Sequence, residues 1–188
     1  MEYQETHIPG AVLIKPVRRL DQRGSFREVF NEDRLRDIGL PPVAFRQMNV
    51  SESRKGVLRG LHFQKLRPQA KLVTVLRGVA VDVVADIRRD SQAFGRYAKA
   101  TLSAENGHAL FIPAGCAHGF VSLTDDLLFC YLCDDTYSGP DDQGGIRWDD
   151  PFFSIYWPFT NPLVSEKDAL LPWTANLRPE DYPFTASR

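Results

Sequence analysis

The stretch GVLRGLHFQ, Gly56 to Gln64, decides how the rest of the sequence is interpreted. It places a basic residue, Arg59, and a histidine, His62, in a run whose other members are mostly apolar, aromatic or glycine, which is typical of a β-strand. Glycine weakens a strand interior, so Gly60 predicts a bulge or the close approach of a ligand or another backbone. Arg59 and His62 are three residues apart and point to opposite faces of a regular strand. Both side chains line one pocket only if the strand pairing slips at Gly60, or if Arg59 lies at the end of the strand and bends inward. The alternative is a core-facing histidine with an exposed arginine.

The composition limits the kind of protein. With 188 residues the chain has the length of one ordinary domain, and we expect a single domain over residues 1–188. A formal charge of −1 leaves no basic field, so no nucleic-acid partner is expected. No apolar run approaches the ~18 residues of a membrane span, and the start MEYQETHIPG is polar. These features predict a soluble, cytoplasmic protein with no membrane partner.

Two of the three cysteines, Cys130 and Cys133, form a C-x-x-C in the apolar run LLFCYLC. The period of a strand places them on opposite faces. A zinc site needs further ligands at suitable spacing, and a redox motif needs a helix start. We therefore predict buried, reduced thiols.

Short strand-like segments surround the opening stretch and are separated by Gly, Pro, Asn and Asp. Their near-regular spacing favours a β-sandwich or barrel over alternating strands and helices. The segments are AVLIKPV (11–17), VAFRQMNVS (43–51), KLVTVL (71–76), VAVDVVADI (79–87), YAKATLS (97–103), HALFIP (108–113), HGFVSL (118–123) and LLFCYL (127–132). Two short helices are predicted, one over EDRLRDI with Asn31 as its N-cap and one starting at Ser165 in SEKDALL.

A second motif, IPAGCAHGF (Ile112 to Phe120), completes a pair with GLHFQ. Together they resemble the two-motif outline of the cupins, double-sheet jelly rolls in which both motifs line the barrel mouth. We therefore expect an all-β, cupin-like double-sheet jelly roll with short peripheral helices. A catalytic metal needs about three protein ligands, but these motifs supply only His62 and His118, and Gln64 stands two residues after His62. The sequence therefore predicts no metal, and a reaction that side-chain acids and bases carry out.

Further motifs, in order along the chain, extend the pattern from Asp21 to Asp168. They are DQRGSFRE, FRQMNVS, GVLRGLHFQ, QAKLV, DVVADIRRDS, IPAGCAHGF, the tyrosines Tyr131 and Tyr137, GIRWDDP and SEKD. With them the chain resembles the dTDP-4-dehydrorhamnose 3,5-epimerases, sugar-nucleotide epimerases of deoxysugar biosynthesis. The resemblance implies a homodimeric jelly roll without cofactor. Its substrate would be a dTDP-4-keto-6-deoxyhexose, and it would convert dTDP-4-dehydro-6-deoxy-D-glucose to dTDP-4-dehydro-L-rhamnose.

The resemblance also implies roles for individual residues. His62 corresponds to the general base, Asp168 to the acid that orients it, Tyr131 to the proton donor and Lys71 to the residue near the keto oxygen. The implied substrate-binding residues are Arg23, Glu28, Gln47, Asn49, Arg59, His118, Tyr137 and Lys167, some of them reached across the dimer.

The implied chemistry explains this choice of residues. C3 and C5 of the sugar both flank the C4 ketone, so loss of a proton from either carbon leaves an enolate with its charge on the C4 oxygen. Return of a proton to the opposite face inverts that carbon. The site therefore needs a base on one face of the sugar, an acid on the other, and positive charge near the oxygen. A histidine with a carboxylate partner suits the base, and a protonated tyrosine suits the acid.

Structural explanations compete at several of these positions. Ser165 with Asp168 is a variant capping box, which accounts for the acid without catalysis. Tyr131 can be a core aromatic, with Tyr137 as the rival donor, and Lys71 an edge-strand lysine that discourages strand pairing. Asp82, in an otherwise apolar strand, is a candidate internal partner for Lys71.

Other functions remain open at this point. Arg23 and Glu28 fit a solvated hairpin tip as well as a nucleotide site. An epimerase that inverts only C3 or only C5 would show the same catalytic residues. A metal-dependent cupin using His62 and His118 as ligands, and a sugar-nucleotide binding module without catalysis, are the alternatives from other classes.

Overall fold

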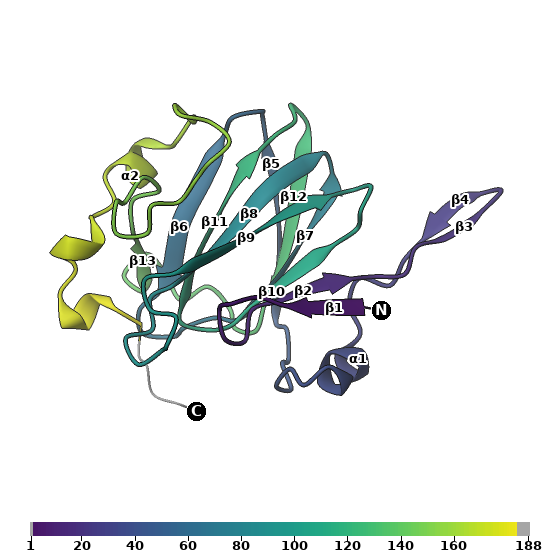
Figure 1. Cartoon of the computed structure of the whole chain (residues 1–188), viewed down its shortest axis with the longest axis horizontal. Coiled ribbons are helices and arrows are strands. Elements are labelled where there is room, and N and C mark those ends of the chain that lie inside the picture. Colours follow the sequence, from purple (N-terminus) through teal and green to yellow (C-terminus); the bar gives the residue numbers. More distant parts are fainter. Residues whose placement is uncertain (1, 184–188) are drawn as a thin grey trace.

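The computed structural model describes residues 2–183, in which two antiparallel β-sheets pack face to face (Figure 1). One sheet has the strand order β1-β2-β10-β7-β12-β5 and the other β13-β6-β11-β8-β9. The strands of the six-stranded sheet are β1 (Glu2–Glu5), β2 (Val12–Lys15), β10 (Ala109–Ile112), β7 (Lys71–Arg77), β12 (Leu127–Cys133) and β5 (Gln47–Ser53). Those of the five-stranded sheet are β13 (Gln143–Gly145), β6 (Leu58–Gln64), β11 (Cys116–Ser122), β8 (Val79–Asp86) and β9 (Tyr97–Ser103). The predicted all-β, double-sheet class is confirmed.

Strand periodicity sorts the apolar side chains into three cores. Alternate residues of the two sheets point toward each other and form the inter-sheet core, which includes Val73, Val75, Val84, Phe120 and Phe129. The opposite face of the five-stranded sheet packs beneath the C-terminal segment, drawn yellow-green to yellow in Figure 1. The outer face of the six-stranded sheet is partly covered by the helix near the N-terminus. The inter-sheet space therefore receives side chains from both layers.

The predicted helices are present and capped as expected. Helix α1 (Glu32–Asp37) begins after Asn31, whose side chain accepts a hydrogen bond from the backbone of Arg34. Helix α2 (Glu166–Ala169) begins after Ser165 in the same manner and is shorter than the SEKDALL segment. Two short 3-10 helices follow, η1 (Thr174–Asn176) and η2 (Pro179–Asp181). No helix in residues 2–183 is long and apolar enough to cross a membrane.

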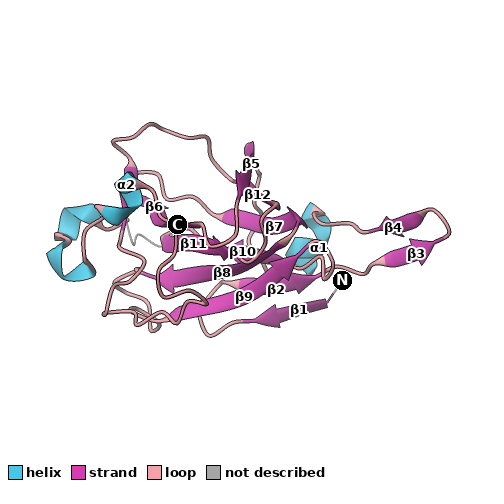
Figure 2. Cartoon of the chain, turned by 90° about the horizontal axis from the view of Figure 1, so that it is seen from above, coloured by secondary structure: helices cyan, strands magenta, loops and turns pink. Residues whose placement is uncertain are grey.

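The predicted strands differ from the observed ones mainly near the N-terminus. Strand β1 was not predicted because EYQE is polar and all four residues are exposed on an edge strand. The strand expected from Val43 begins only at Gln47, since the preceding residues form an irregular segment that packs against the α1 core. The segment around Arg23 is a hairpin of β3 (Arg19–Asp21) and β4 (Gly24–Phe26) that projects away from both sheets (Figures 1 and 2).

Candidate active site

The pairing of β6 with β11 slips at Gly60. His62 lies opposite His118, and Arg59 opposite Phe120, so two residues of β6 face the single Gly119 between them. Such a bulge reverses the parity of the strand. Arg59 and His62 consequently share the inter-sheet face with His118. The slip is one of the two arrangements that the sequence allowed. Arg59 shares the inter-sheet face and is nevertheless exposed, as the alternative expected.

Glycine is required where β6 crosses β11. Gly60 has a φ of +121°, and a Cβ there would lie 2.7 Å from both Gly119 Cα and the His118 carbonyl oxygen. A Cβ on Gly119 would in turn lie 2.7 Å from the Arg59 carbonyl oxygen. The two backbones therefore approach more closely than any side chain permits.

The bulge also anchors the carboxylate that faces His62. His62 Nε2 lies 2.7 Å from Asp168 Oδ1, and the Gly60 backbone N–H donates to Asp168 Oδ2 at 3.2 Å. An ionised carboxylate only accepts, so the neutral imidazole carries its proton on Nε2. Nδ1 is then the basic nitrogen, and the His62 side chain, 27% exposed, can present it to a ligand.

Asp168 takes part both in the His62 contact, through its carboxylate, and in the helix cap, through its backbone. The Ser165 hydroxyl accepts from the Asp168 backbone N–H at 3.1 Å, which is the predicted N-cap. The carboxylate does not return to the cap, because it bonds to His62 and Gly60 instead. Burial alone would raise the pKa of Asp168, but the hydrogen bond and charge of His62, the Gly60 N–H and nearby Lys167 together lower it. Asp168 is therefore held ionised.

Tyr131 and Lys71 lie on the facing sheet. Tyr131 is on β12 and pairs with Val73 of β7, and Lys71 pairs with Cys133. All four side chains share the parity of the inter-sheet core, so they face β6 and β11. Strand β7 lies between β10 and β12, so the edge-strand explanation for Lys71 is wrong.

Burial shifts both of these groups toward their neutral forms. Desolvation, with a smaller contribution from Cys133, raises the pKa of Tyr131, and Arg59 opposes it. Desolvation lowers the pKa of Lys71, while Cys133, Asp82 and Asp134 oppose it. Tyr131 therefore keeps its proton over a wide pH range.

A second histidine–aspartate pair lies beside the first. His118 Nε2 is 2.8 Å from Asp82 Oδ2, and Asp82 is fully buried on β8. The sequence pointed to Asp82 only as a partner of Lys71, whereas its hydrogen bond goes to His118. Arg59 is fixed nearby, since its guanidinium donates to Ser53 Oγ at 3.1 Å and to the Glu52 carbonyl at 3.0 Å.

The predicted binding residues form two further groups near the strand ends. Gln47 Nε2 donates to Asn49 Oδ1 at 2.9 Å, and the Tyr137 backbone N–H donates to Gln47 Oε1 at 2.7 Å. Lys167, next to Asp168, donates to Gln143 Oε1 at 2.7 Å. Gln143 was not predicted as a site residue. The signal in the sequence was its position just before the GIRWDDP motif.

Two predicted binding residues are not brought to this site within one chain. Arg23 lies at the tip of the β3–β4 hairpin, far from β6 in both views, and pairs with Asp21 at 2.6 Å (Figures 1 and 2). Glu28 lies between that hairpin and α1, where it pairs with Arg34 at 2.8 Å. The hairpin-tip explanation therefore describes Arg23 in the single chain.

Within the part of the chain that the structure describes, neither His62 nor His118 belongs to a set of metal ligands. Within residues 2–183, no group of three or more His, Cys, Asp or Glu side chains is arranged to hold a metal ion. Each histidine instead contacts one aspartate, His62 with Asp168 and His118 with Asp82.

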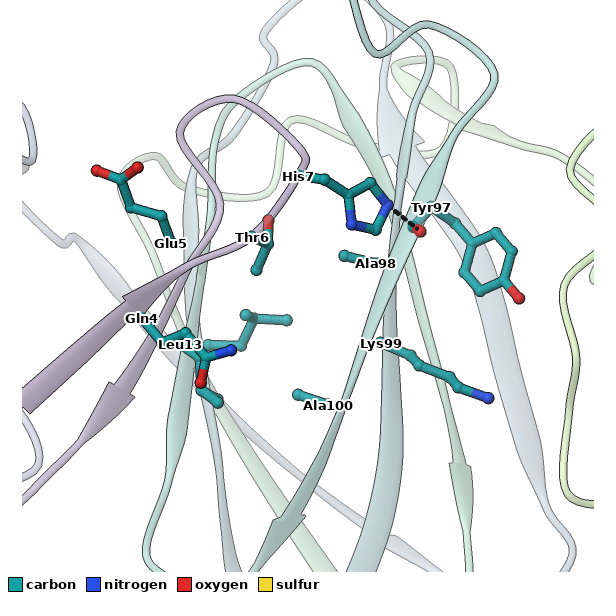
Figure 3. Close-up of a pocket in the computed structure, with 10 residues that line it drawn as sticks. Gln4, Glu5, Thr6, His7, Leu13, Tyr97, Ala98, Lys99 and Ala100 are labelled. Carbon is teal, nitrogen blue, oxygen red and sulfur yellow. Dashed lines mark hydrogen bonds between the residues drawn. The ribbon is translucent and has the colours of Figure 1, made fainter.

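A separate hollow of about 420 Å³ lies between β1 and β9, which are edge strands of the two sheets (Figure 3). Its floor contains Leu13, Ala98 and Ala100, and His7 Nε2 donates to the Tyr97 carbonyl at 2.7 Å across it. No member of the His62 site lines this hollow.

The fold and these side chains define a class of protein, a double-sheet barrel whose interior holds a histidine–aspartate pair opposite a protonated tyrosine. A family model described as dTDP-4-dehydrorhamnose 3,5-epimerase matches residues 5–176. The chain belongs to this family, whose named members are isomerases.

Individual relatives agree with this assignment. The dTDP-4-dehydrorhamnose 3,5-epimerase of Methanothermobacter thermautotrophicus is 45% identical over 167 residues, covering 87% of this chain and 89% of that protein. A crystal structure of dTDP-6-deoxy-D-glucose-3,5-epimerase from Legionella pneumophila, in complex with dTDP-4-keto-L-rhamnose, superposes with a TM-score of 0.92. It is 38% identical and covers 97% of each chain. A 3'-monoepimerase from Streptomyces bikiniensis in complex with dTDP-quinovose is 35% identical with a TM-score of 0.85, covering 90% of this chain and 86% of that chain.

Proposed function

We propose that the protein epimerises dTDP-4-dehydro-6-deoxy-D-glucose at C3 and C5 to give dTDP-4-dehydro-L-rhamnose, using side-chain acid–base chemistry without a cofactor. The observation that carries this proposal is the placement of the His62–Asp168 pair and of Tyr131 on facing sheets. A sugar ring bound between the sheets then has a base on one face and an acid on the other, which is what inversion requires.

His62 acts as the base. Its Nδ1 takes the proton from C3 or C5, and the electron pair of the C–H bond moves to the C4 oxygen as an enolate. The imidazolium that forms is stabilised by Asp168 at 2.7 Å, which is buried and already ionised. The bulge at Gly60 directs both groups to the same point.

Tyr131 acts as the acid. It donates its hydroxyl proton to the opposite face of the same carbon, the enolate collapses to the ketone, and the configuration is inverted. The phenolate then recovers a proton from water while His62 releases its own. Because burial raises the pKa of Tyr131, the donor is fully protonated at neutral pH.

Lys71 stabilises the enolate. Its ammonium is buried on the same wall as Tyr131, where little water screens its charge. Arg59 and His118 occupy the wall beside His62 and bind the sugar and diphosphate oxygens, a task suited to the several N–H donors of a guanidinium. Gln47, Asn49, Tyr137 and Lys167 complete the substrate contacts around the strand ends.

We infer a homodimer in which the β3–β4 hairpin reaches a second copy. Arg23 and Glu28 then contribute to the partner's nucleotide site, which explains why they lie away from His62 in one chain. Two exposed apolar surfaces support this arrangement. Leu20 and Phe26 are 72% and 70% exposed on the hairpin, and Met48 and Val50 are 60% and 51% exposed on the edge strand β5. Sedimentation should show a dimer at micromolar concentration; a monomer would contradict it.

A cytoplasmic location follows from the same proposal. The three cysteines are free and buried, which fits a reducing compartment, and the substrate is an activated sugar nucleotide. We treat residues 1–188 as one domain because both sheets share one core.

An epimerase that inverts a single carbon would share this geometry, as the Streptomyces bikiniensis monoepimerase illustrates. The names of curated relatives favour the double epimerase. Proton NMR in D2O with chelator present distinguishes the two. Deuterium should enter both C3 and C5 in the wild type and neither in His62→Ala. Entry at one carbon would indicate the single epimerase, and entry at none would contradict the proposal.

A further inference from the structure

Asp82 is a fully buried acid of the inter-sheet interior that the proposed mechanism leaves without a role. It lies at the centre of β8, with the apolar Val81 and Val83 on either side, and it shares the inward parity of Ala80 and Val84. One oxygen, Oδ2, bonds to His118. The other, Oδ1, is buried and has no hydrogen-bond partner among the described residues. A buried carboxylate with half of its acceptors unused is destabilising unless its charge is compensated.

Lys71 is a buried lysine of the facing sheet. Its side chain is buried on β7, in the facing sheet, and forms no ion pair or hydrogen bond with any residue in the range 2–183. The ionisable groups that act on it are Cys133 on β12, Asp134 directly after β12, and Asp82 across the interior. Cys133 is a buried thiol whose pKa is itself raised by burial, so it supplies no negative charge at neutral pH. Asp134 is bonded to the Ala70 backbone N–H outside the barrel interior.

We infer that Asp82 is a positioning residue for the proposed reaction: it fixes the ring of His118 and supplies the counter-charge that keeps the Lys71 ammonium protonated between the sheets. This inference rests on the proposed function for its chemistry and goes beyond it in assigning one carboxylate to both walls of the site. The first part follows from the 2.8 Å contact with His118. The second follows from the position of Asp82 on the face opposite Lys71, with one oxygen unbonded.

The consequence for His118 is a defined tautomer. Asp82 accepts the Nε2 proton, so Nδ1 faces the cavity and can carry a second proton toward a phosphate or sugar oxygen. The consequence for Lys71 is that its ammonium keeps its positive charge at the pH at which the enzyme works. Burial lowers the pKa of Lys71, and the negative charge of Asp82 opposes that shift, so removing Asp82 lowers it further.

The test uses Asp82→Asn in the full-length protein, because the amide has nearly the same shape as the carboxylate. Lys71 is followed by ¹³C NMR of its ε-carbon, assigned by comparison with Lys71→Arg. In Asp82→Asn the titration of Lys71 should move to lower pH by about one unit, the size of effect that one nearby charge produces. The alkaline limb of kcat/KM should move by the same amount. KM should rise about tenfold, since His118 loses its charge-assisted hydrogen bond.

Two controls separate this role from a structural one. Ser51→Ala removes the buried hydroxyl of a half-buried β5 residue, which also has no hydrogen-bond partner among the described residues, and should leave the Lys71 titration in place. In the Lys71→Arg background the guanidinium stays charged, so adding Asp82→Asn should not move the pH profile.

An unchanged Lys71 titration in Asp82→Asn would overturn the inference. Should that variant not fold, a neutral Lys71 in the wild type at pH 8 would overturn it, and a protonated one would support it. The NMR titration needs no turnover, so failure of the proposed epimerase would appear separately, as absent deuterium exchange.

Discussion

Replacing Asp168 by Asn tests the His62–Asp168 pair directly. The carboxylate accepts two hydrogen bonds, from His62 at 2.7 Å and from the Gly60 backbone at 3.2 Å, whereas an amide oxygen and an amide NH2 cannot replace both acceptors. If the Asn oxygen keeps the Gly60 bond, the NH2 faces Nε2 and forces the proton onto Nδ1, which removes the base. If the Asn oxygen instead keeps the hydrogen bond with His62, the imidazolium loses the negative charge that stabilises it.

The magnitude follows from the burial of this contact. The Asp168 side chain is 6% exposed, so solvent screens the interaction little. A hydrogen bond to a charged group contributes about 1.5–3 kcal/mol, and each 1.36 kcal/mol is about tenfold in rate. We therefore expect kcat/KM of Asp168→Asn to fall about 10- to 150-fold, measured by the rate of deuterium entry at C3 and C5.

The matched control is Ser165→Ala. It removes the α2 N-cap, which should lower the free energy of unfolding by about 1 kcal/mol while leaving the carboxylate in place. Its kcat/KM should stay close to that of the wild type. Equal losses of activity in Ser165→Ala and Asp168→Asn would mean that Asp168 acts through helix stability alone, and the reasoning about the pair would be wrong.

Three further outcomes are expected. Tyr131→Phe should retain deuterium exchange at the carbon that His62 deprotonates but lose inversion by about 10²-fold or more, as seen by NMR of the product configuration. Gly60→Ala should lower Tm by about 5–10 °C, because its Cβ would lie 2.7 Å from Gly119, whereas Gly56→Ala, which also has a positive φ but no neighbour within 4 Å, should lower it less. Asp86 is buried, which alone would raise its pKa, but hydrogen bonds from Arg88 and Ser91 bring it below its usual value. Its ionised form therefore adds stability above its unfolded pKa of about 3.9 that is lost as the pH falls through the lower folded value, so Tm should fall less between pH 5 and 3 in Asp86→Asn than in the wild type.

The strand pattern around His62 illustrates how far the sequence alone leads. Local composition predicts a strand with a disturbance at Gly60, and the structure confirms both. Local composition does not determine whether the strand pairing slips or Arg59 bends, because that depends on the partner strand. The decisive contact is between Gly60 and Gly119, which are 59 positions apart in the sequence. Only the register of β6 against β11 brings them together.

Asp168 shows a second limit. The S-x-x-D pattern correctly predicts a cap at Ser165, and the resemblance to the epimerases correctly brings Asp168 toward His62. The two explanations are compatible, since the backbone N–H of Asp168 serves the cap and its carboxylate serves the histidine. Sequence patterns treat a residue as one unit, whereas its backbone and side chain satisfy different partners.

Asp82 was recognisable from sequence as a paired acid, but its hydrogen-bond partner was not. An acid in VAVDVVAD has to be paired, because burial of an isolated charge is unfavourable. The identity of the hydrogen-bond partner follows from sheet order, in which β8 lies beside β11, whereas β7 belongs to the other sheet. A neighbouring strand provides His118 within hydrogen-bond distance, while Lys71 on the facing sheet is reached only by its electrostatic field.

The two sheets also determine how far His62 and Tyr131 stand apart. Side chains on one face of a sheet point in one direction, so a single sheet cannot present groups to both faces of a sugar ring. The inter-sheet space can, provided that its width is fixed. Phe120 of β11 and Phe129 of β12 stack across it with ring centroids 3.9 Å apart and planes 8° apart. Phe129 also neighbours both His118 and Tyr131, at 6.1 Å and 6.4 Å between centroids. The spacing of the two facing walls is thus set by the aromatic core packed between the sheets.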